Sequence, residues 1–291
     1  MSQSSSGASL KAFIQYLAIE VIVMKRGSKA AGIVLSTMGL GVLLCPSLPT
    51  QAAPLISNAP MIRGHLTTGS NASSSSKTHN LGWESTNWSG YVLSGGTYNS
   101  ITGYWVVPTV QSSKSATYSS SWIGIDGYND SDLIQTGTEQ DYYNGSAHYG
   151  AWWEILPAAE TPISMTVEPG DEMYADIQNE GNGQWLIEIK DITRNETFST
   201  TQAYSGPQSS AEWIQERPMV GNRLSTLANY GETTFDPASV NGSNPGFTSS
   251  ESGAMVNNSG TQIISYPSNP DSDTDGFNVA YGSTQPAPPA S

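Results

Sequence analysis

Short alternating runs of apolar residues, broken by turn-forming residues, limit most strongly how this chain can fold. Residues 163–167 (ISMTV) and 173–177 (MYADI) alternate on either side of Glu168–Asp171, where Pro followed by Gly predicts a type II turn, so a β-hairpin is expected over residues 163–178. No window shows a helical period longer than two turns. Further strands are expected over residues 101–107, 185–189, 197–203 and 277–281. Strands spaced in this way indicate an all-β protein, an antiparallel β-sandwich or a barrel.

The composition is typical of an exported β protein that binds neither nucleic acid nor anionic lipid. Charged residues make up only 12% of the 291 residues. The formal net charge is −14 at pH 7, and from Leu81 onward there are five basic residues against 24 acidic ones. Such a surface repels phosphate groups. Because many of these acids bind protons near about pH 4, the composition also favours an acidic medium.

The N-terminal part has the pattern of a leader that is removed. A signal peptide is predicted to begin at Met24, with basic residues directly after it and an apolar run over residues 30–44. Thr50-Gln51-Ala52 fits a small-x-small cleavage site. We therefore expect residues 1–52 to comprise an over-called start and a signal peptide, and the protein to be secreted. The apolar run is too short for a comfortable membrane span, so no membrane association is expected after its removal.

The composition divides the rest of the chain into three predicted segments. Residues 53–80 are rich in Ser, Asn and Thr and nearly lack acids, which predicts a pro-segment or a disordered linker. Because this segment carries Arg63, Lys77 and two histidines, we expect it to cover an acidic cleft at neutral pH and to leave it on acidification. Residues 81–282 are the predicted catalytic domain, and residues 283–291 a loose Pro-rich tail.

The available side chains exclude several classes of hydrolase. The single cysteine, Cys45, lies in the predicted signal peptide, so neither a zinc–cysteine site nor a thiol nucleophile is expected. Beyond residue 80 there is one histidine, His148, and there is no HExxH, GxSxG, Asp-Thr-Gly or Asp-Ser-Gly. The side chains that remain as candidates for catalysis are carboxyl and amide groups. One carboxyl with an oxyanion donor can hydrolyse a peptide bond, and two carboxyls can hydrolyse a glycosidic bond.

Five short blocks carry a family resemblance. In chain order they are Asn87–Gly90 (NWSG), Trp122–Gly127 (WIGIDG), Leu133–Gly137 (LIQTG), Tyr149–Glu154 (YGAWWE) and Ala211–Glu216 (AEWIQE). Together they resemble the glutamic peptidases, the eqolisin family of acid endopeptidases, in a cysteine-free form of bacterial type. The resemblance runs from about Trp83 to the C-terminus. It implies a sandwich of two large antiparallel sheets with concanavalin-like, jelly-roll architecture, and an enzyme that needs no metal or cofactor.

The same resemblance implies that Gln135 and Glu216 are the catalytic pair. Glu216 would take a proton from the attacking water and return it to the leaving nitrogen, and the Gln135 amide would donate to the oxyanion. A glutamine does not titrate, whereas a base that works in acid fits a Glu near its ordinary pKa of about 4.3. Glu212, four residues earlier, would face the same side of an extended strand, so it is the residue most easily confused with the base.

Six other residues match positions that line or brace the cleft in this family. They are Trp88, Trp122, Asp126, Glu139, Trp152 and Glu154. Glu139 and Gly150 stand where related chains carry Asp, so the residue at 139 has a longer arm and one acidic contact at 150 is missing.

Two other functions stay open at this point. A glycoside hydrolase would use two of Glu154, Glu212, Glu216 and Asp126, and a non-enzymatic glycan-binding module would stack its tryptophans on sugars. Neither needs an amide at position 135, so the LIQTG block favours the peptidase. The expected partners are protein or peptide substrates, and the expected state is a monomer.

An acidic run near the C-terminus begins like a calcium-binding loop. Asp271-Ser-Asp-Thr-Asp275-Gly276 matches the first half of such a loop, but Gly282 stands at the twelfth position, where a Glu is required. The sequence alone therefore favours a polar turn.

Overall fold

The computed structural model describes residues 54–64 and 81–291. The predictions for residues 1–52, and for Lys77 and the two histidines of the predicted pro-segment, lie outside these residues. No helix occurs in the described residues, and accordingly none is long and apolar enough to cross a membrane.

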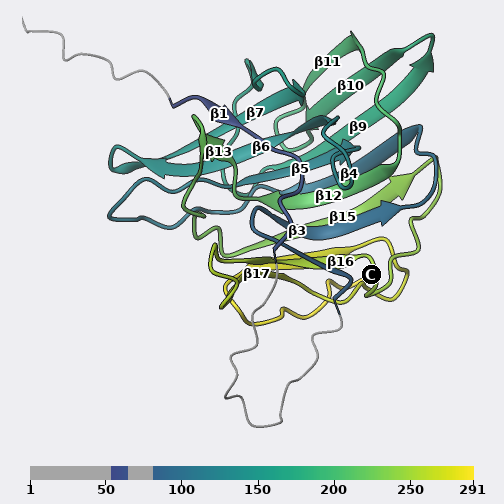
Figure 1. The fold of residues 1–291 in the computed structure, drawn as a ribbon. Coiled ribbons are helices and arrows are strands. Elements are labelled where there is room, and N and C mark those ends of the chain that lie inside the picture. Colours follow the sequence, from purple (N-terminus) through teal and green to yellow (C-terminus); the bar gives the residue numbers. More distant parts are fainter. Residues whose placement is uncertain (1–53, 65–80) are drawn as a thin grey trace, which may run out of the picture. The chain divides into compact units, whose positions relative to one another are not determined.

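The described residues form eighteen strands (Figure 1). In chain order the strands are β1 (Ile56–Ser57), β2 (Trp83–Ser85), β3 (Trp88–Ser94), β4 (Ser100–Val106), β5 (Ser120–Ile125), β6 (Ile134–Tyr143), β7 (Ser146–Ile155), β8 (Thr161–Ile163), β9 (Glu172–Gly181), β10 (Gln184–Asp191), β11 (Glu196–Ala203), β12 (Ser210–Glu216), β13 (Met219–Val220), β14 (Arg223–Leu224), β15 (Glu232–Val240), β16 (Ser252–Val256), β17 (Ile263–Pro267) and β18 (Phe277–Tyr281).

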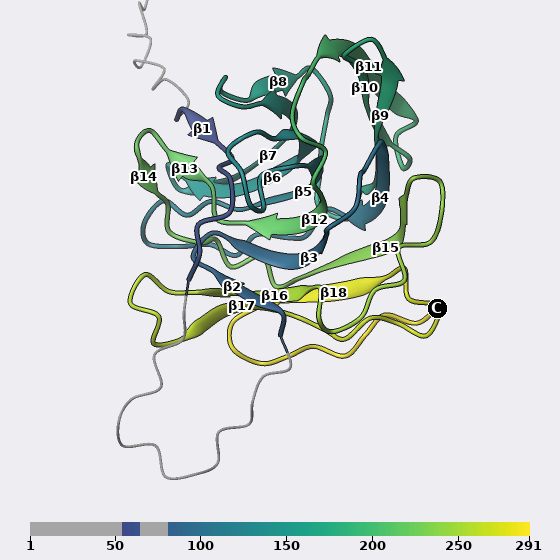
Figure 2. The ribbon, with the colours of Figure 1, turned by 45° about the vertical axis from the view of Figure 1, so that its right-hand side comes forward.

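Fifteen of these strands hydrogen-bond into one ladder that folds over on itself as a sandwich (Figure 2). The ladder order is β11-β10-β9-β4-β15-β18-β17-β16-β3-β12-β5-β6-β7-β8, and β2 pairs with β16 in parallel. The other named strands pair antiparallel, and β1, β13 and β14 form a small separate sheet. The antiparallel all-β sandwich predicted from the sequence is confirmed.

Two local predictions are wrong. Residues 163–178 do not form a hairpin, because β8 pairs with β7 and β9 pairs with β4 and β10. The turn itself is present: the Asp171 N–H donates to the Glu168 carbonyl at 3.1 Å, and Gly170 has a φ of 90° that favours glycine. The C-terminal tail is not loose, since Gln285 donates to the Pro267 carbonyl and Asn278 donates to the Ala287 carbonyl.

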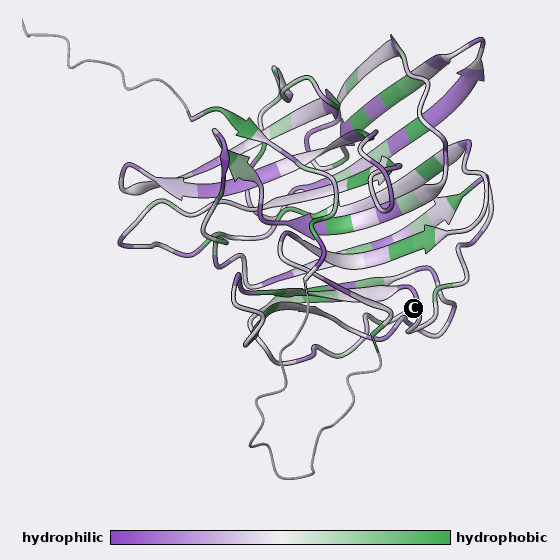
Figure 3. Ribbon diagram, viewed as in Figure 1, coloured by the Kyte–Doolittle hydropathy of each residue, from purple (hydrophilic) through white to green (hydrophobic). Residues whose placement is uncertain are grey.

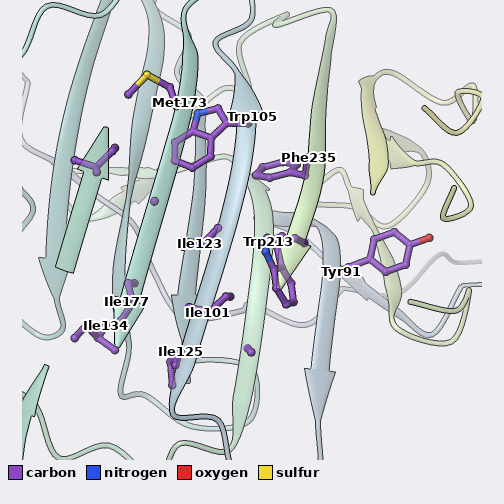
Figure 4. Packing of buried hydrophobic residues seen from close by; sticks show 14 of the residues in the cluster. Tyr91, Ile101, Trp105, Ile123, Ile125, Ile134, Met173, Ile177, Trp213 and Phe235 are labelled. Carbon is purple, nitrogen blue, oxygen red and sulfur yellow. The ribbon is translucent and has the colours of Figure 1, made fainter. Parts of the chain in front are cut away.

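The main core lies between the two layers of the sandwich. Apolar and polar residues alternate along the strands, so each layer turns one apolar face inward (Figure 3). Trp105 of β4 and Trp213 of β12 are buried there among isoleucines from both layers (Figure 4). Their indole N–H groups donate to Thr138 and to the Thr102 carbonyl at 3.0 and 2.8 Å, so both bonds cross between the layers.

Candidate active site

Three neighbouring strands place the predicted catalytic pair on one face of the sheet. β5 lies between β12 and β6, with Ser120 opposite both Glu216 of β12 and Glu139 of β6. Gln135 precedes Glu139 by four residues, and residues an even number apart along a strand point to the same face. Gln135 and Glu216 therefore share a face although they lie far apart in the sequence.

Gln135 is buried and held by Glu154, its neighbour across the β6–β7 pair. Its Nε2 atom donates to Glu154 Oε2 at 2.8 Å and lies 3.5 Å from the main-chain oxygen of Asn58. An amide nitrogen carries two N–H groups, so Glu154 can hold one while the other faces a carbonyl oxygen. Gln135 Oε1 accepts no hydrogen bond from the part of the chain that the structure describes, which leaves it able to accept one from a reacting group.

Glu216 is buried at the end of β12 and accepts three hydrogen bonds. The Trp122 indole N–H donates to Oε2 at 2.9 Å. Asn87 Nδ2 and the main-chain N–H of Ala59 donate to Oε1 at 3.3 and 3.0 Å. The carboxyl group therefore directly contacts the nitrogen of a peptide bond, the Asn58–Ala59 bond, whose carbonyl oxygen faces Gln135.

Burial dominates the electrostatics of both carboxyl groups in the site. It raises the pKa of Glu216 well above its usual range, although the hydrogen bonds from Ala59, Asn87 and Trp122 act in the opposite direction. Burial also raises the pKa of Glu154 to about 7, against the hydrogen bonds that it accepts. The expectation of an ordinary pKa for Glu216 is therefore wrong for this state of the site, in which a segment of the chain excludes water.

That segment is residues 54–64, which we call the cleft segment. It begins in β1, where Ile56 lies opposite Val220 of β13. Ser57 Oγ then donates to Glu154 Oε1 at 2.8 Å, and the Asn58 N–H donates to Glu154 Oε2 at 3.1 Å. The cleft segment is thus attached to the sandwich on the N-terminal side of the Asn58–Ala59 bond.

On the C-terminal side of this bond the cleft segment is held through its main chain. Trp88 Nε1 donates to the Ala59 carbonyl at 3.0 Å, and Asn87 Oδ1 accepts from the Ile62 N–H at 2.7 Å. The Met61 N–H donates to the Gly127 carbonyl at 3.0 Å. These bonds would form with almost any side chain in the segment.

Arg63 of the cleft segment contacts an amide and an aromatic ring. Its Nη2 atom donates to Asn129 Oδ1 at 2.6 Å, and its guanidinium group lies 5.3 Å from the centre of the Tyr128 ring. Arg63 therefore makes no ion pair within the described residues, and the expected attraction of residues 53–80 to the acidic cleft stays a prediction.

The three tryptophans of the prediction lie together beneath the site. Trp88, Trp122 and Trp152 are buried in one cluster, and the rings of Trp88 and Trp122 meet edge to face with centroids 5.0 Å apart. Gly137 lies opposite Trp122, and a Cβ at Gly137 would be only 2.4 Å from the Cβ of Trp122. The glycine therefore allows the close approach of β6 to β5 at Trp122, whose indole N–H donates to Glu216.

Asp126 braces a loop and does not contact the catalytic pair. It accepts hydrogen bonds from the Tyr204 hydroxyl at 2.6 Å and from the N–H groups of Gln208 and Ser209 at 2.9 and 2.6 Å. Its φ of 73° is unusual for a non-glycine residue, and these three bonds hold it there. Gly127, the next residue, carries the carbonyl that the cleft segment binds.

Glu139 and Gly150 lie opposite each other in the β6–β7 pair. A Cβ at Gly150 would be 2.9 Å from Glu139 Oε1, so the longer arm of Glu139 covers the space above the small residue. Burial raises the pKa of Glu139 to about 7 and that of Glu160 to about 9, where Glu139 and Glu154 add to the rise. Glu139 therefore belongs to an acidic cluster beside the site.

Glu212 lies on the same face of β12 as Glu216, as predicted, but it has different surroundings. It sits opposite Gly124 and Val92 and is fully buried. Neither of its carboxyl oxygens has a hydrogen-bond partner within the described residues, and burial raises its pKa well above the usual range. The peptide nitrogen of the cleft segment contacts Glu216 and not Glu212.

The sequence did not single out four residues of the site. They are Asn58, Asn87, Ser120 and Glu160. Asn87 stands in the NWSG block, and its amide was the only signal that could have marked it as a donor to a carboxylate. The other three carry no local signal, because only the strand pairing and the path of the cleft segment bring them together.

Sequence comparison finds relatives among named peptidases. The profile of the Peptidase A4 family matches residues 86–279. Aspergillopepsin-2 from Aspergillus niger is 30% identical over 181 residues, covering 53% of this chain and 64% of that protein. Scytalidopepsin B from Scytalidium lignicola is 27% identical over 136 residues, covering 45% of this chain and 51% of that protein. The chain thus spans less than two thirds of the length of these curated relatives.

Two solved structures share the fold. Scytalido-glutamic peptidase with a transition state analog inhibitor, and the same peptidase with a peptide-based transition state analog, align with TM-scores of 0.56 and 0.57. Each alignment covers 67% of this chain and 98% of that chain at 20% sequence identity. This likeness supports the β-sandwich.

Proposed function

The chain belongs to the Peptidase A4 family, and we propose that it is a secreted acid endopeptidase of the glutamic type. It cuts protein and peptide substrates as a monomer, without a metal or a cofactor. The observation that carries the proposal is the peptide bond between Asn58 and Ala59, which lies between the Gln135 amide and the Glu216 carboxyl group.

Glu216 is the general base and then the general acid in this proposal. As a carboxylate it takes a proton from water, and the water oxygen attacks the carbonyl carbon of the substrate. The carbon–nitrogen bond then breaks, and Glu216 returns the proton to the leaving nitrogen. Its 3.0 Å contact with the Ala59 N–H supports the second step, because that is where the leaving nitrogen would lie.

Gln135 stabilises the oxyanion, and Glu154 positions Gln135. The 3.5 Å separation between Gln135 Nε2 and the Asn58 oxygen is long for a hydrogen bond, and such contacts shorten as negative charge develops on the oxygen. The 2.8 Å bond to Glu154 keeps the amide from rotating away. The Gln135 Oε1 atom is able to accept a hydrogen bond from the attacking water.

The carboxyl groups of the site account for activity in acid. An ionised Glu154 places a negative charge beside the oxyanion, so activity falls as pH rises through the pKa of Glu154. On the acid side, Glu216 must be ionised. Departure of the cleft segment admits water to Glu216, which lowers its pKa back toward the usual range of a glutamate.

Secretion and synthesis as a zymogen complete the proposal. Secretion is supported by the leader-like sequence before Pro54. Synthesis as a zymogen is supported by the cleft segment, which blocks access to Gln135 and Glu216. Residues 53–80 are then the pro-segment.

The test is digestion of an unfolded protein between about pH 2 and pH 7. We expect activity only in acid, with a loss of about a hundredfold or more in Gln135→Ala and a larger loss in Glu216→Gln, while circular dichroism shows both variants folded. Glu212→Gln is the matched control on the same strand and should keep its activity. Acid proteolysis that survives both changes would refute the assigned pair, and no proteolysis at any pH would refute the peptidase.

A further inference from the structure

Three aspartates that are distant in the sequence meet beside β15 and β18. One carboxyl oxygen from each of Asp236, Asp271 and Asp275 lies within 4.8 Å of the others. Asp271 and Asp275 belong to the loop between β17 and β18, and Asp236 belongs to β15. The two strands lie side by side (Figure 2), and the pairing of Phe235 with Phe277 brings Asp236 to the end of that loop. Strand pairing therefore assembles the cluster.

The main chain holds the loop in place. The Asp271 N–H donates to the Gly276 carbonyl at 2.9 Å, which closes the loop on itself. The Ala238 N–H of β15 donates to the Asp275 carbonyl at 2.9 Å, which fastens the loop to that strand. These bonds fix the position of the loop independently of the three carboxyl groups.

Asp271 presents a buried carboxyl oxygen without a partner to the other aspartates. The residue is only 6% exposed, and its Oδ1 atom accepts from the N–H groups of Asp275 and Gly276, each at 3.2 Å. Its Oδ2 atom has no hydrogen-bond partner in the described ranges. A Cβ at Gly276 would lie 2.7 Å from both Oδ2 and the Asp236 carboxyl carbon, so these two groups lie against the same glycine. A buried polar atom of this kind calls for a ligand that replaces its lost water.

No ion pair among the described residues neutralises the cluster. The ion pairs formed there use Lys190 and Arg194, and neither side chain pairs with any of the three aspartates. The buried Asp275 Oδ1 atom likewise has no hydrogen-bond partner within residues 54–64 and 81–291. Buried charges are generally paired or coordinate a metal ion. A divalent cation would supply the missing positive charge.

The ligand atoms of the cluster favour calcium over other metals. They are all carboxyl oxygens, whereas transition metals favour imidazole or thiolate ligands. Magnesium usually binds through about one or two carboxylates and keeps several waters, but calcium accepts about six to eight oxygen ligands. Calcium–oxygen distances are about 2.4 Å, so two ligands of one ion are at most about 4.8 Å apart. The three aspartates meet that limit.

We propose that Asp236, Asp271 and Asp275 form a structural calcium site. Asp271 and Asp275 stand at the first and fifth positions of a calcium-binding loop, and Gly276 stands at the sixth, where such loops carry glycine. The usual glutamate of the twelfth position is replaced by Gly282, which an extended β18 carries about 15–20 Å away from the loop. Asp236 of the neighbouring strand β15 supplies the missing acidic ligand.

The expected effect of calcium is on stability. An ion at this site would join β15 to the loop before β18, and an ion that binds only the folded chain stabilises it. No hydrogen bond within the described residues links the three aspartates to Gln135 or Glu216. The site therefore lies outside the proposed catalytic machinery.

Calorimetric titration of the full chain with calcium chloride at about pH 7, after treatment with a chelator and dialysis, tests the site directly. Sodium chloride at about 0.1 M screens loose association of calcium with the acidic surface. We expect one saturable site, and a rise in Tm of about 3 °C or more at a hundredfold excess of calcium over its Kd. Magnesium chloride should bind about tenfold more weakly or less. Absence of calcium binding would overturn the inference, and magnesium binding as tight as that of calcium would overturn the choice of ion.

Two substitutions locate the site. Asp236→Asn and Asp271→Asn should each weaken calcium binding about tenfold or more and remove the rise in Tm. An asparagine at position 271 keeps an Oδ1 atom for the N–H groups of Asp275 and Gly276, so the loop stays closed. Without calcium, Asp236→Asn should melt at or above the wild-type temperature, because it removes an uncompensated negative charge.

Glu172→Gln, at an exposed acid on β9, is the matched control and should bind calcium as the wild type does. Unchanged binding in both aspartate variants would overturn the site. A lower Tm of Asp236→Asn in the absence of calcium would also overturn it, because Asp236 would then serve the fold and not an ion.

Discussion

β12 is buried on both faces, but the two faces are buried in different ways. On one face, Ala211 and Trp213 pack into the core between the layers, and apolar side chains permanently surround them. On the other face, Glu216 is covered by the cleft segment, with the Ala59 N–H directly on its carboxyl group. Burial on the first face stabilises the fold, whereas burial on the second lasts only as long as the cleft segment stays in place.

The groups that hold the fold therefore differ in their response to pH from the groups that we propose for the chemistry. Apolar burial adds stability at any pH. A buried carboxyl group favours its neutral form, so its contribution to stability depends on pH. The same strand thus carries one face that is insensitive to pH and one that responds to acid.

The largest expected effect is on the core face. Trp213→Ala should lower the free energy of unfolding by about 3–5 kcal/mol, because it leaves a large cavity and the Thr102 carbonyl loses its donor. Urea unfolding followed by tryptophan fluorescence measures the loss. A change below about 1 kcal/mol would mean that the two layers are not held together at this point.

The second-largest expected effect is a change in the free energy of unfolding with pH, caused by a buried carboxyl group in the cleft. The pKa of Glu154 is raised to about 7 in the folded protein against about 4.3 in the unfolded chain. Its contribution is therefore fully present below about pH 4 and is lost as pH rises through about 7, which amounts to roughly 3–4 kcal/mol. Unfolding free energies of Glu216→Gln, in which the cleft segment stays uncut, should fall between about pH 4 and pH 8.

Adding Glu154→Gln to the Glu216→Gln variant should make the free energy of unfolding decrease less between about pH 4 and pH 8, because the amide does not titrate. A stability that rises with pH over this range would contradict the assignment. In the otherwise wild-type enzyme, Glu154→Gln should also extend proteolysis toward neutral pH, because the amide places no negative charge beside the oxyanion at any pH.

A smaller effect, on the rate of catalysis, is expected from Trp122, whose indole N–H donates to Glu216. Trp122→Phe removes the indole N–H that Glu216 accepts at 2.9 Å and should lower kcat about tenfold to a hundredfold. Trp213→Phe is the matched change on the opposite face and should lower Tm while leaving kcat unchanged in the folded protein. Equal loss of kcat in both variants would show that the two faces are not independent.

The smallest effect is expected at Glu212. This buried acid has no hydrogen-bond partner in the structure as described, so Glu212→Gln should raise the free energy of unfolding by about 1 kcal/mol near neutral pH and by little in acid. Thermal unfolding at about pH 4 and pH 8 measures the difference. A loss of stability at pH 8 would mean that the carboxylate has a role in the fold.

The sequence alone predicted the all-β class, some of the strands and the residues of the candidate site. Alternation located β4, β10, β11 and β18 to within a residue or two, because side chains of a strand alternate between two environments. The LIQTG and AEWIQE blocks marked Gln135 and Glu216. Both are local patterns, and local patterns can be seen without the fold.

Strand partners and groups that meet across the fold were not predictable. Residues 163–178 have the pattern of a hairpin, yet β8 and β9 pair with other strands, because pairing depends on burial in the whole sandwich. In the same way, only the path of the chain brings Asn58 to Gln135 and Asp236 to Asp271.

The sequence by itself therefore determined that this is an acidic, all-β protein with an amide and a carboxyl group suited to peptide hydrolysis. The tertiary structure alone decided which peptide lies between them and which carboxyl groups are buried there. The physical reason is that chemical type belongs to a residue, whereas burial, pKa and hydrogen-bond partners depend on neighbours that are distant along the chain.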